Sequence, residues 1–124
     1  MKNLMLLLLL PATIAFSDLD NINKAIANGD AAALSQYFDD VVEIAVLDEE
    51  DMYDKAEAKT VIANFFAKHK PKSFKMAHEG VSKNEDSKYT IGNLSTEDGK
   101  TFRVYVYFNI TGNAYRIQEI RFDK

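Results

Sequence analysis

The sequence predicts an α+β domain in which three helices close a cone-shaped, curved antiparallel sheet. Three observations carry this prediction. Apolar residues recur at helical spacing before Pro71, and after Pro71 they alternate with a period of two to the end of the chain. Gly80 and Gly92 fall inside the expected strands, where glycine commonly marks a bulge or a sharp bend. Helices packed on one face of such a sheet would give a covered core.

The first seventeen residues have the features of an export leader. Lys2 precedes the apolar run 4–10, and the A-x-S sequence at 15–17 is followed by Asp18. The run is too short to act as a membrane anchor. We therefore expect a signal peptide at 1–17, one domain at 18–124, and a protein that is exported to the periplasm or secreted.

The composition restricts the classes of partner and chemistry. Loss of Lys2 with the leader lowers the net charge from −4 to −5, which disfavours nucleic acid and anionic membranes as partners. The chain has no cysteine, so disulfides, thiolate metal sites and cysteine nucleophiles are excluded. Phosphate-binding glycine loops, serine nucleophile motifs and paired-histidine zinc motifs are also absent. We expect neither a cofactor nor a metal.

The helices are expected in the first half of the chain. Asp18 is the expected N-cap of a helix with Ile22 and Ile26 on its apolar stripe, and Gly29 ends it. Asp30 would cap a second helix that ends at 39–40 and whose apolar face is Leu34, Tyr37 and Phe38. After a strand at 41–47 and a short return strand at 52–53, Asp54 would cap a third helix that reaches Pro71, with Glu57 three residues further on.

The second half of the chain predicts a four-strand meander. Alternating segments at 72–83, 88–96, 101–111 and 114–123 are separated by turn sequences rich in Asn, Asp and Gly. In the third of these strands the even positions 102–110 are all apolar and must face the core, so the odd positions face outward. The last strand does not keep one parity, which predicts a bulge and leaves the direction of Glu119 open.

Two short helices, a strand hairpin, a third helix and a four-strand meander, in this order, resemble the nuclear transport factor 2-like superfamily, which includes the ketosteroid isomerase and SnoaL types. Local sequences at 25–30, 52–58 and 115–117 are also similar to that superfamily, and the resemblance covers the whole expected domain. Small exported domains of unknown function occur among its bacterial members. The resemblance implies the cone-shaped fold. It does not choose among enzymes, ligand binders and interaction modules.

His78 is the titratable residue that we expect on the inner face of the first meander strand, because it continues the alternation of Phe74 and Met76. An enzyme of the ketosteroid isomerase type would need an inward carboxylate, and none can be placed with this pattern. The residues that we expect to line a ligand site are Tyr37, Phe66, Met76, His78, Asn93 and Phe102.

The sequence thus favours a binding or interaction module without a catalytic constellation. A small apolar ligand inside the cone is one expected partner. A second copy of the chain is the other, because the odd positions Arg103, Tyr105 and Tyr107 would form an exposed face of residue types that are common at interfaces. The alternative is a small isomerase or dehydratase that uses His78, with Tyr37 or Asn93 as hydrogen-bond donor.

The leader yields the first testable prediction. We expect the mature protein to begin at Asp18, because the A-x-S sequence provides the small residues that signal peptidase needs. N-terminal sequencing of protein from the exporting host measures this. Recovery of Met1 on the mature protein would contradict the export prediction.

Overall fold

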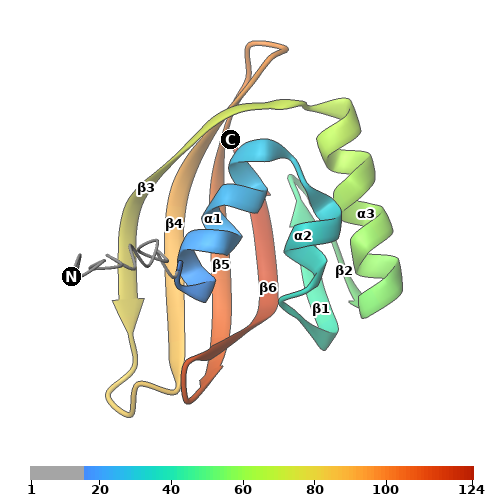
Figure 1. The fold of residues 1–124 in the computed structure, drawn as a ribbon. Coiled ribbons are helices and arrows are strands. Elements are labelled where there is room, and N and C mark those ends of the chain that lie inside the picture. The colour runs from blue at the N-terminus through green and yellow to red at the C-terminus, as the bar shows by residue number, and fades with distance from the viewer. Residues whose placement is uncertain (1–15) are drawn as a thin grey trace, which may run out of the picture.

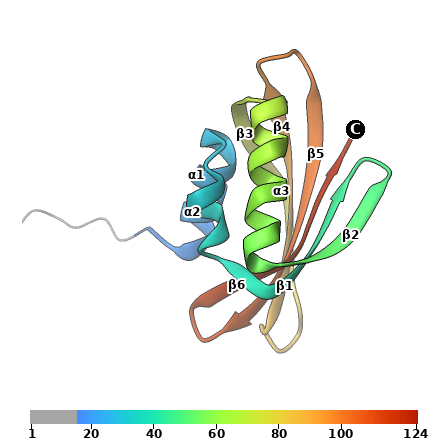
Figure 2. The same cartoon turned by 90° about the vertical axis from the view of Figure 1, so that its right-hand side faces the viewer.

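A computed structural model describes residues 16–124 of the chain. The leader predicted at 1–17 therefore lies almost wholly outside the described residues. Three helices pack on one face of a six-stranded sheet, as Figures 1 and 2 show from two sides. The helices are α1 (Asp18–Asn28), α2 (Ala31–Ser35) and α3 (Lys55–Lys68). The strands are β1 (Phe38–Val46), β2 (Glu49–Asp54), β3 (Pro71–Val81), β4 (Ser87–Thr96), β5 (Thr101–Thr111) and β6 (Ala114–Asp123). The predicted α+β class and the helix-first order are confirmed.

The sheet has the strand order β2-β1-β6-β5-β4-β3. The meander β3 to β6 and the hairpin β1–β2 are antiparallel, but β1 lies parallel to β6. The expected antiparallel sheet is therefore a mixed sheet. A parallel neighbour is possible because the connection from β1 to β6 runs through α3 and the meander, which is long enough for a crossover.

Both ends of α1 carry the local signals that the sequence predicted, with one correction. Ser17, not Asp18, is the N-cap: its side chain accepts a hydrogen bond from the Asp20 amide, and the Asp20 carboxylate accepts one from the Ser17 amide. Gly29 adopts the left-handed conformation at the other end, with φ of 64°. Asp18 is thereby left free to contact another element.

The second helix is shorter than expected. It ends at Ser35, and Phe38 belongs to β1, where it pairs with Ile117. The Tyr37 carbonyl accepts a hydrogen bond of 2.6 Å from the Ile117 amide. Pairing with β6 therefore overrides the helical spacing of Tyr37 and Phe38, since the sheet provides the backbone partners that another helical turn would have supplied.

The sheet bends at positions where one strand carries an extra residue. Between Met76 and His78 the pairing of β3 with β4 shifts, so that Ala77 forms a bulge. Gln118 forms a second bulge, between Ile117 and Glu119 in β6, which confirms the bulge predicted there. A bulge reverses the faces of all residues beyond it, because side chains alternate along a strand.

Gly92 lies at the first bend and faces the helices. A Cβ atom built on Gly92 would lie 2.4 Å from the Phe74 ring and 3.0 Å from the Lys75 carbonyl oxygen. The ring therefore packs directly over the glycine backbone, an arrangement that compensates for the missing side chain. In the part of the chain that the structure describes, no helix has the length and apolar character needed to cross a membrane.

We expect Gly92→Ala to lower the free energy of unfolding by about 1–3 kcal/mol, because the added methyl group overlaps the Phe74 ring. Thermal unfolding followed by circular dichroism measures this. The matched control is Asn93→Ala, an exposed neighbour on the same strand, which should change stability by no more than about 0.5 kcal/mol. Equal stability of Gly92→Ala and the wild type would show that the ring can move away at no cost.

Candidate functional site

The narrow part of the cone is filled by aromatic side chains. Phe65 stacks on Phe122 with ring centroids 4.0 Å apart and meets Phe102 edge-on at 5.2 Å. Phe66 and Phe102 are 4% and 3% exposed, and both belong to the hydrophobic core. These two residues, which the sequence placed at a ligand site, therefore stabilise the fold by packing.

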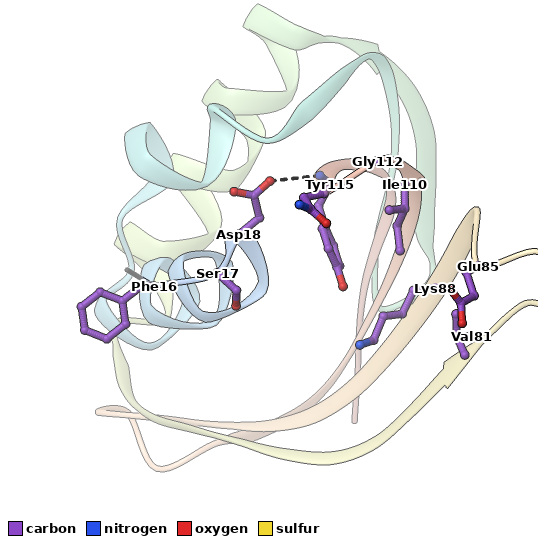
Figure 3. A pocket seen from close by; sticks show the side chains of 10 residues that line it. Phe16, Ser17, Asp18, Val81, Glu85, Lys88, Ile110, Gly112 and Tyr115 are labelled. Carbon is purple, nitrogen blue, oxygen red and sulfur yellow. Dashed lines mark hydrogen bonds between the residues drawn. The ribbon is translucent and has the colours of Figure 1, made fainter. Parts of the chain in front are cut away.

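The wide end of the cone contains a hollow of about 650 Å³, which we call the mouth pocket (Figure 3). It lies between the start of α1 and the ends of the meander strands. Ten residues line it: Phe16, Ser17, Asp18, Val81, Glu85, Lys88, Ile110, Gly112, Asn113 and Tyr115. Its volume falls within the range of small-molecule sites, about 300–1,000 Å³.

Asp18 joins the helical wall of the mouth pocket to its sheet wall. Its carboxylate accepts a hydrogen bond of 3.1 Å from the backbone amide of Tyr115, which is drawn as a dashed line in Figure 3. The Tyr115 ring meets the buried Phe108 edge-on at 5.3 Å. Tyr115 is thus held by its backbone and its ring, while its hydroxyl end extends into the pocket (Figure 3).

Lys88 is the cationic residue of the mouth pocket. It pairs across the sheet with Val81 on one side and Phe108 on the other, so its side chain lies on the helix-facing side of the sheet. Only 17% of that side chain is exposed. Its ammonium group lies 3.4 Å from the carboxylate of Glu79, whose side chain is 58% exposed. Glu79 reaches this side because the bulge at Ala77 reverses the alternation of β3.

The same bulge places His78 on the side of the sheet opposite to the one that the sequence predicted. His78 pairs with Ile91, is exposed, and lies on the convex side of the sheet, away from the helices. Asn93 is also exposed on that side, since the buried positions of β4 are the even ones, from Thr90 to Thr96. The predicted inward placement of both residues is therefore wrong.

The six predicted ligand-site residues are not brought together. Met76 keeps its inward direction on β3 but is 38% exposed and does not line the mouth pocket. Tyr37 lines a different hollow, of about 300 Å³, between α1 and α2. The sequence did not predict Lys88 and Tyr115, which do line the mouth pocket. Lys88 alternates with the small or polar residues Thr90 and Gly92, so its strand gives no clear apolar parity.

The mouth pocket offers groups for binding. The Lys88 ammonium and the Tyr115 hydroxyl can both donate to an acceptor oxygen, and Val81 and Ile110 provide apolar wall. Among its described lining residues, the Ser17 hydroxyl already caps α1 and the Asp18 carboxylate already accepts from Tyr115. A nucleophile held by a general base, which acyl transfer would need, is therefore not assembled by these residues.

A second group of polar residues joins the end of α3 to the β4–β5 turn. The His69 ring nitrogen Nδ1 lies 2.9 Å from the Asp98 carboxylate, and the ring packs between Phe65 and Phe102. Hydrogen bonds from Thr96 and from His69 lower the pKa of Asp98 below its usual value of 3.8. His69 is the C-cap of α3, and its partner is a carboxylate from a distant turn.

Three carboxylates, Glu43, Glu50 and Glu119, meet on the convex side of the sheet with ligand atoms within 4.8 Å of one another. Arg121 already binds two of them, at 3.2 Å from Glu50 and 3.4 Å from Glu119. Hydrogen bonding with Glu50, burial and the charge of Glu119 together raise the pKa of Glu43. The direction of Glu119, which the sequence left open, is therefore outward.

Comparison with known proteins gives a family without an assigned function. A family model described as domain of unknown function DUF4783 matches residues 19–123. The chain is 32% identical to a DUF4783 protein of known crystal structure from Bacteroides ovatus, with a TM-score of 0.77 over 84% of this chain and 92% of that one. A DUF4783 protein from Bacteroides uniformis is 33% identical, with the same TM-score over 84% and 94%.

A more distant structure shows the wider fold. A putative dehydratase of the NTF2-like family from Streptomyces avermitilis is 13% identical, with a TM-score of 0.60 over 83% of this chain and 87% of that one. This likeness concerns the fold alone. No curated protein matches the sequence. The predicted resemblance to the nuclear transport factor 2-like superfamily is confirmed at the level of the fold.

Asp98 gives a prediction about pH. Because its pKa is lower in the folded protein than in the unfolded chain, its contribution to stability is present above the usual value of 3.8 and is lost as the pH falls through the folded value. We expect Asp98→Asn to lower the melting temperature at pH 7, and the difference from the wild type to shrink under acid conditions. Calorimetry over a pH series measures this. Glu97→Gln, next to it and exposed, is the control, and an Asp98→Asn deficit that does not change with pH would contradict the linkage.

Proposed function

The chain belongs to the DUF4783 family and has a nuclear transport factor 2-like fold, and from this premise we propose that it is an exported module that binds a small ligand in the mouth pocket. One observation carries the proposal. A lysine side chain that is only 17% exposed extends into a hollow of about 650 Å³, beside a tyrosine hydroxyl and apolar walls. Lysine is seldom covered to this extent unless its charge has a partner.

The lining residues indicate the chemistry of the ligand. Val81, Ile110 and the Tyr115 ring favour an apolar body, and the Lys88 ammonium favours an acceptor such as a carbonyl or carboxylate at one end. In the structure without a ligand, the Glu79 carboxylate forms the ion pair with Lys88. The Glu79 side chain is mostly exposed, so it can turn toward water. The ligand acceptor would then replace Glu79 as the partner of Lys88.

Binding is favoured over catalysis by the positions of the titratable groups. The enzymatic alternative used His78 inside the cone, and His78 lies on the convex side. The His69–Asp98 pair is a candidate base and its orienting carboxylate, but His69 lines a separate hollow of about 470 Å³ beside α3 and does not line the mouth pocket. General acid–base chemistry requires such a group within reach of a bound substrate.

Export is part of the proposal and rests on the sequence of residues 1–17. Cleavage after Ser17 would remove Phe16 and Ser17 from the lining of the mouth pocket, so the proposed ligand would contact the lining residues from Asp18 onward. A module outside the cytoplasm would meet its ligand directly from the surroundings, through the open end of the cone. Native mass spectrometry of protein purified from the exporting host would identify a ligand that remains bound.

Binding of 1-anilinonaphthalene-8-sulfonate tests the site, because this probe combines an apolar body with an anionic acceptor. We expect one probe to bind the folded protein, with chemical shift changes at Val81, Ile110 and Tyr115. Val81→Arg should abolish binding by filling the hollow. Lys88→Met should weaken it about tenfold or more, which corresponds to the loss of one hydrogen bond to a charged group.

The matched control is Val41→Arg, since Val41 is 51% exposed and Val81 is 59% exposed, but Val41 lies on β1 outside the pocket. It should leave probe binding unchanged. Equal probe affinity of the wild type, Val81→Arg and Lys88→Met would refute the mouth pocket as the binding site.

A further inference from the structure

A second hollow, of about 470 Å³, lies between the end of α3 and the turn that joins β1 to β2, and we call it the α3 hollow. Val46, Val61 and Phe65 provide its apolar wall. His69, the C-cap of α3, also lines it. Its volume lies within the range of small-molecule sites, about 300–1,000 Å³. The α3 hollow therefore combines apolar surface with one imidazole ring.

The His69 imidazole is held by three neighbours. Its Nδ1 atom lies 2.9 Å from the Asp98 carboxylate, and its ring centroid lies 5.2 Å from that of Phe65 and 5.0 Å from that of Phe102. An ionised carboxylate can only accept a hydrogen bond, so Nδ1 donates it and carries the proton of the neutral ring. The other ring nitrogen, Nε2, then offers a free lone pair.

Asp98 is itself fixed by the turn between β4 and β5. The hydroxyl group of Thr96, a residue that is 3% exposed, donates a hydrogen bond to the other carboxylate oxygen. The Thr96 amide donates to the Lys100 carbonyl at 2.9 Å, and the Gly99 amide donates to the Thr96 carbonyl at 3.1 Å. The hydrogen bonds from Thr96 and His69 lower the pKa of Asp98, so its carboxylate is ionised at neutral pH. A side chain that is oriented by a second, fixed group is typical of a functional site.

The Nε2 edge of the His69 ring is the part that is open to the α3 hollow. In the described part of the chain, every buried side-chain nitrogen or oxygen of a residue that is not itself exposed has a hydrogen-bond partner. The ring of His69 uses Nδ1 for its hydrogen bond, and Nε2 has no partner among the described residues, so water must reach Nε2. Asp98 covers the Nδ1 edge and two phenylalanine rings pack against the imidazole, which leaves the Nε2 edge to face the hollow.

The charged residues around the α3 hollow favour a neutral ligand. Lys68 contributes a positive charge, and Asp48 and Glu49 each contribute a negative charge; all three residues are exposed. An anion would meet the two carboxylates, and a cation would meet the ammonium group. A neutral ligand that donates one hydrogen bond would satisfy Nε2 without adding a charge to this mixed rim.

We propose that the α3 hollow binds a phenol, whose hydroxyl group donates a hydrogen bond to Nε2 of His69. The aromatic ring of the ligand would lie against Val46, Val61 and Phe65, since apolar and aromatic walls favour such a ring. Asp98 would act as a positioning residue, because it keeps the ring proton on Nδ1 and the lone pair on Nε2.

Binding of p-cresol, followed by nuclear magnetic resonance, tests the site. We expect saturable binding, with chemical shift changes at Val46, at Val61 and at Nε2 of His69. The matched ligand is 4-methylanisole, which has the same ring but a methyl group in place of the hydroxyl hydrogen, so it cannot donate. It should bind at least about fivefold more weakly, because one hydrogen bond is lost. Equal affinity for the two ligands, or no saturation up to about 10 mM, would overturn the proposal.

His69→Phe removes the acceptor and keeps an aromatic ring beside Phe65 and Phe102. This variant should bind p-cresol only as tightly as it binds 4-methylanisole. The matched control is His78→Phe, since His78 is the other histidine of the chain and is exposed on the convex side. The control should leave both affinities unchanged. A preference for p-cresol that survives in His69→Phe would refute His69 as the acceptor.

The tautomer of His69 provides a measurement that needs no variant. Nitrogen-15 chemical shifts of the wild-type ring should place its proton on Nδ1 before p-cresol is added, and a proton on Nε2 would contradict the proposal.

The α3 hollow and the mouth pocket can be tested separately, because they lie at opposite ends of β4. Lys88 is near the start of this strand and Asp98 follows its end. Lys88→Met, which should weaken probe binding at the mouth pocket, should therefore leave the affinity for p-cresol unchanged. A loss of p-cresol binding in Lys88→Met would place the phenol in the mouth pocket and overturn this second site.

Discussion

The extra residue in β3 determines which side chains reach the inside of the cone. Ala77 shifts the pairing with β4 by one position, so Phe74 faces the helices while His78 faces away from them. Beyond the bulge, Glu79 and Val81 face inward and reach Lys88. The polar end of the mouth pocket and the exposed position of His78 on the convex side both depend on this single insertion, because a bulge reverses alternation for the rest of a strand.

Helix ends and strand faces could be predicted from the sequence where a single local signal, such as a capping residue or strict alternation, determines them. Asp54 caps α3, Gly29 ends α1, and the strict alternation of β5 buries Phe102 to Phe108 at even positions as expected. The parts that failed depend on distant partners. Phe38 leaves the helix because Ile117 pairs with it, and His78 changes face because β4 has no residue opposite Ala77. The candidate site could not be predicted, since the inward positions next to Lys88 on β4, Thr90 and Gly92, are small or polar.

Two neighbouring residues of β4 illustrate how a thin sheet separates two surfaces. Lys88 faces the mouth pocket and Tyr89 faces the convex side, because consecutive side chains of a strand point in opposite directions. The same holds for Tyr107 and the buried Phe108 on β5. A change at either surface therefore leaves the side chains of the other in place, so the two faces of the sheet can vary independently.

The N-cap of α1, Ser17, lies at the proposed cleavage site of the leader. A cut after Ser17 would remove the hydroxyl that accepts from Asp20 and leave a free ammonium group at the positive end of the helix dipole. The first turn of α1 would then be less stable in the processed chain than in its precursor. That turn also holds Asp18 against Tyr115. Proteolytic maturation would thus loosen the wall of the cone's open end, and the precursor would hold that end in its more rigid form.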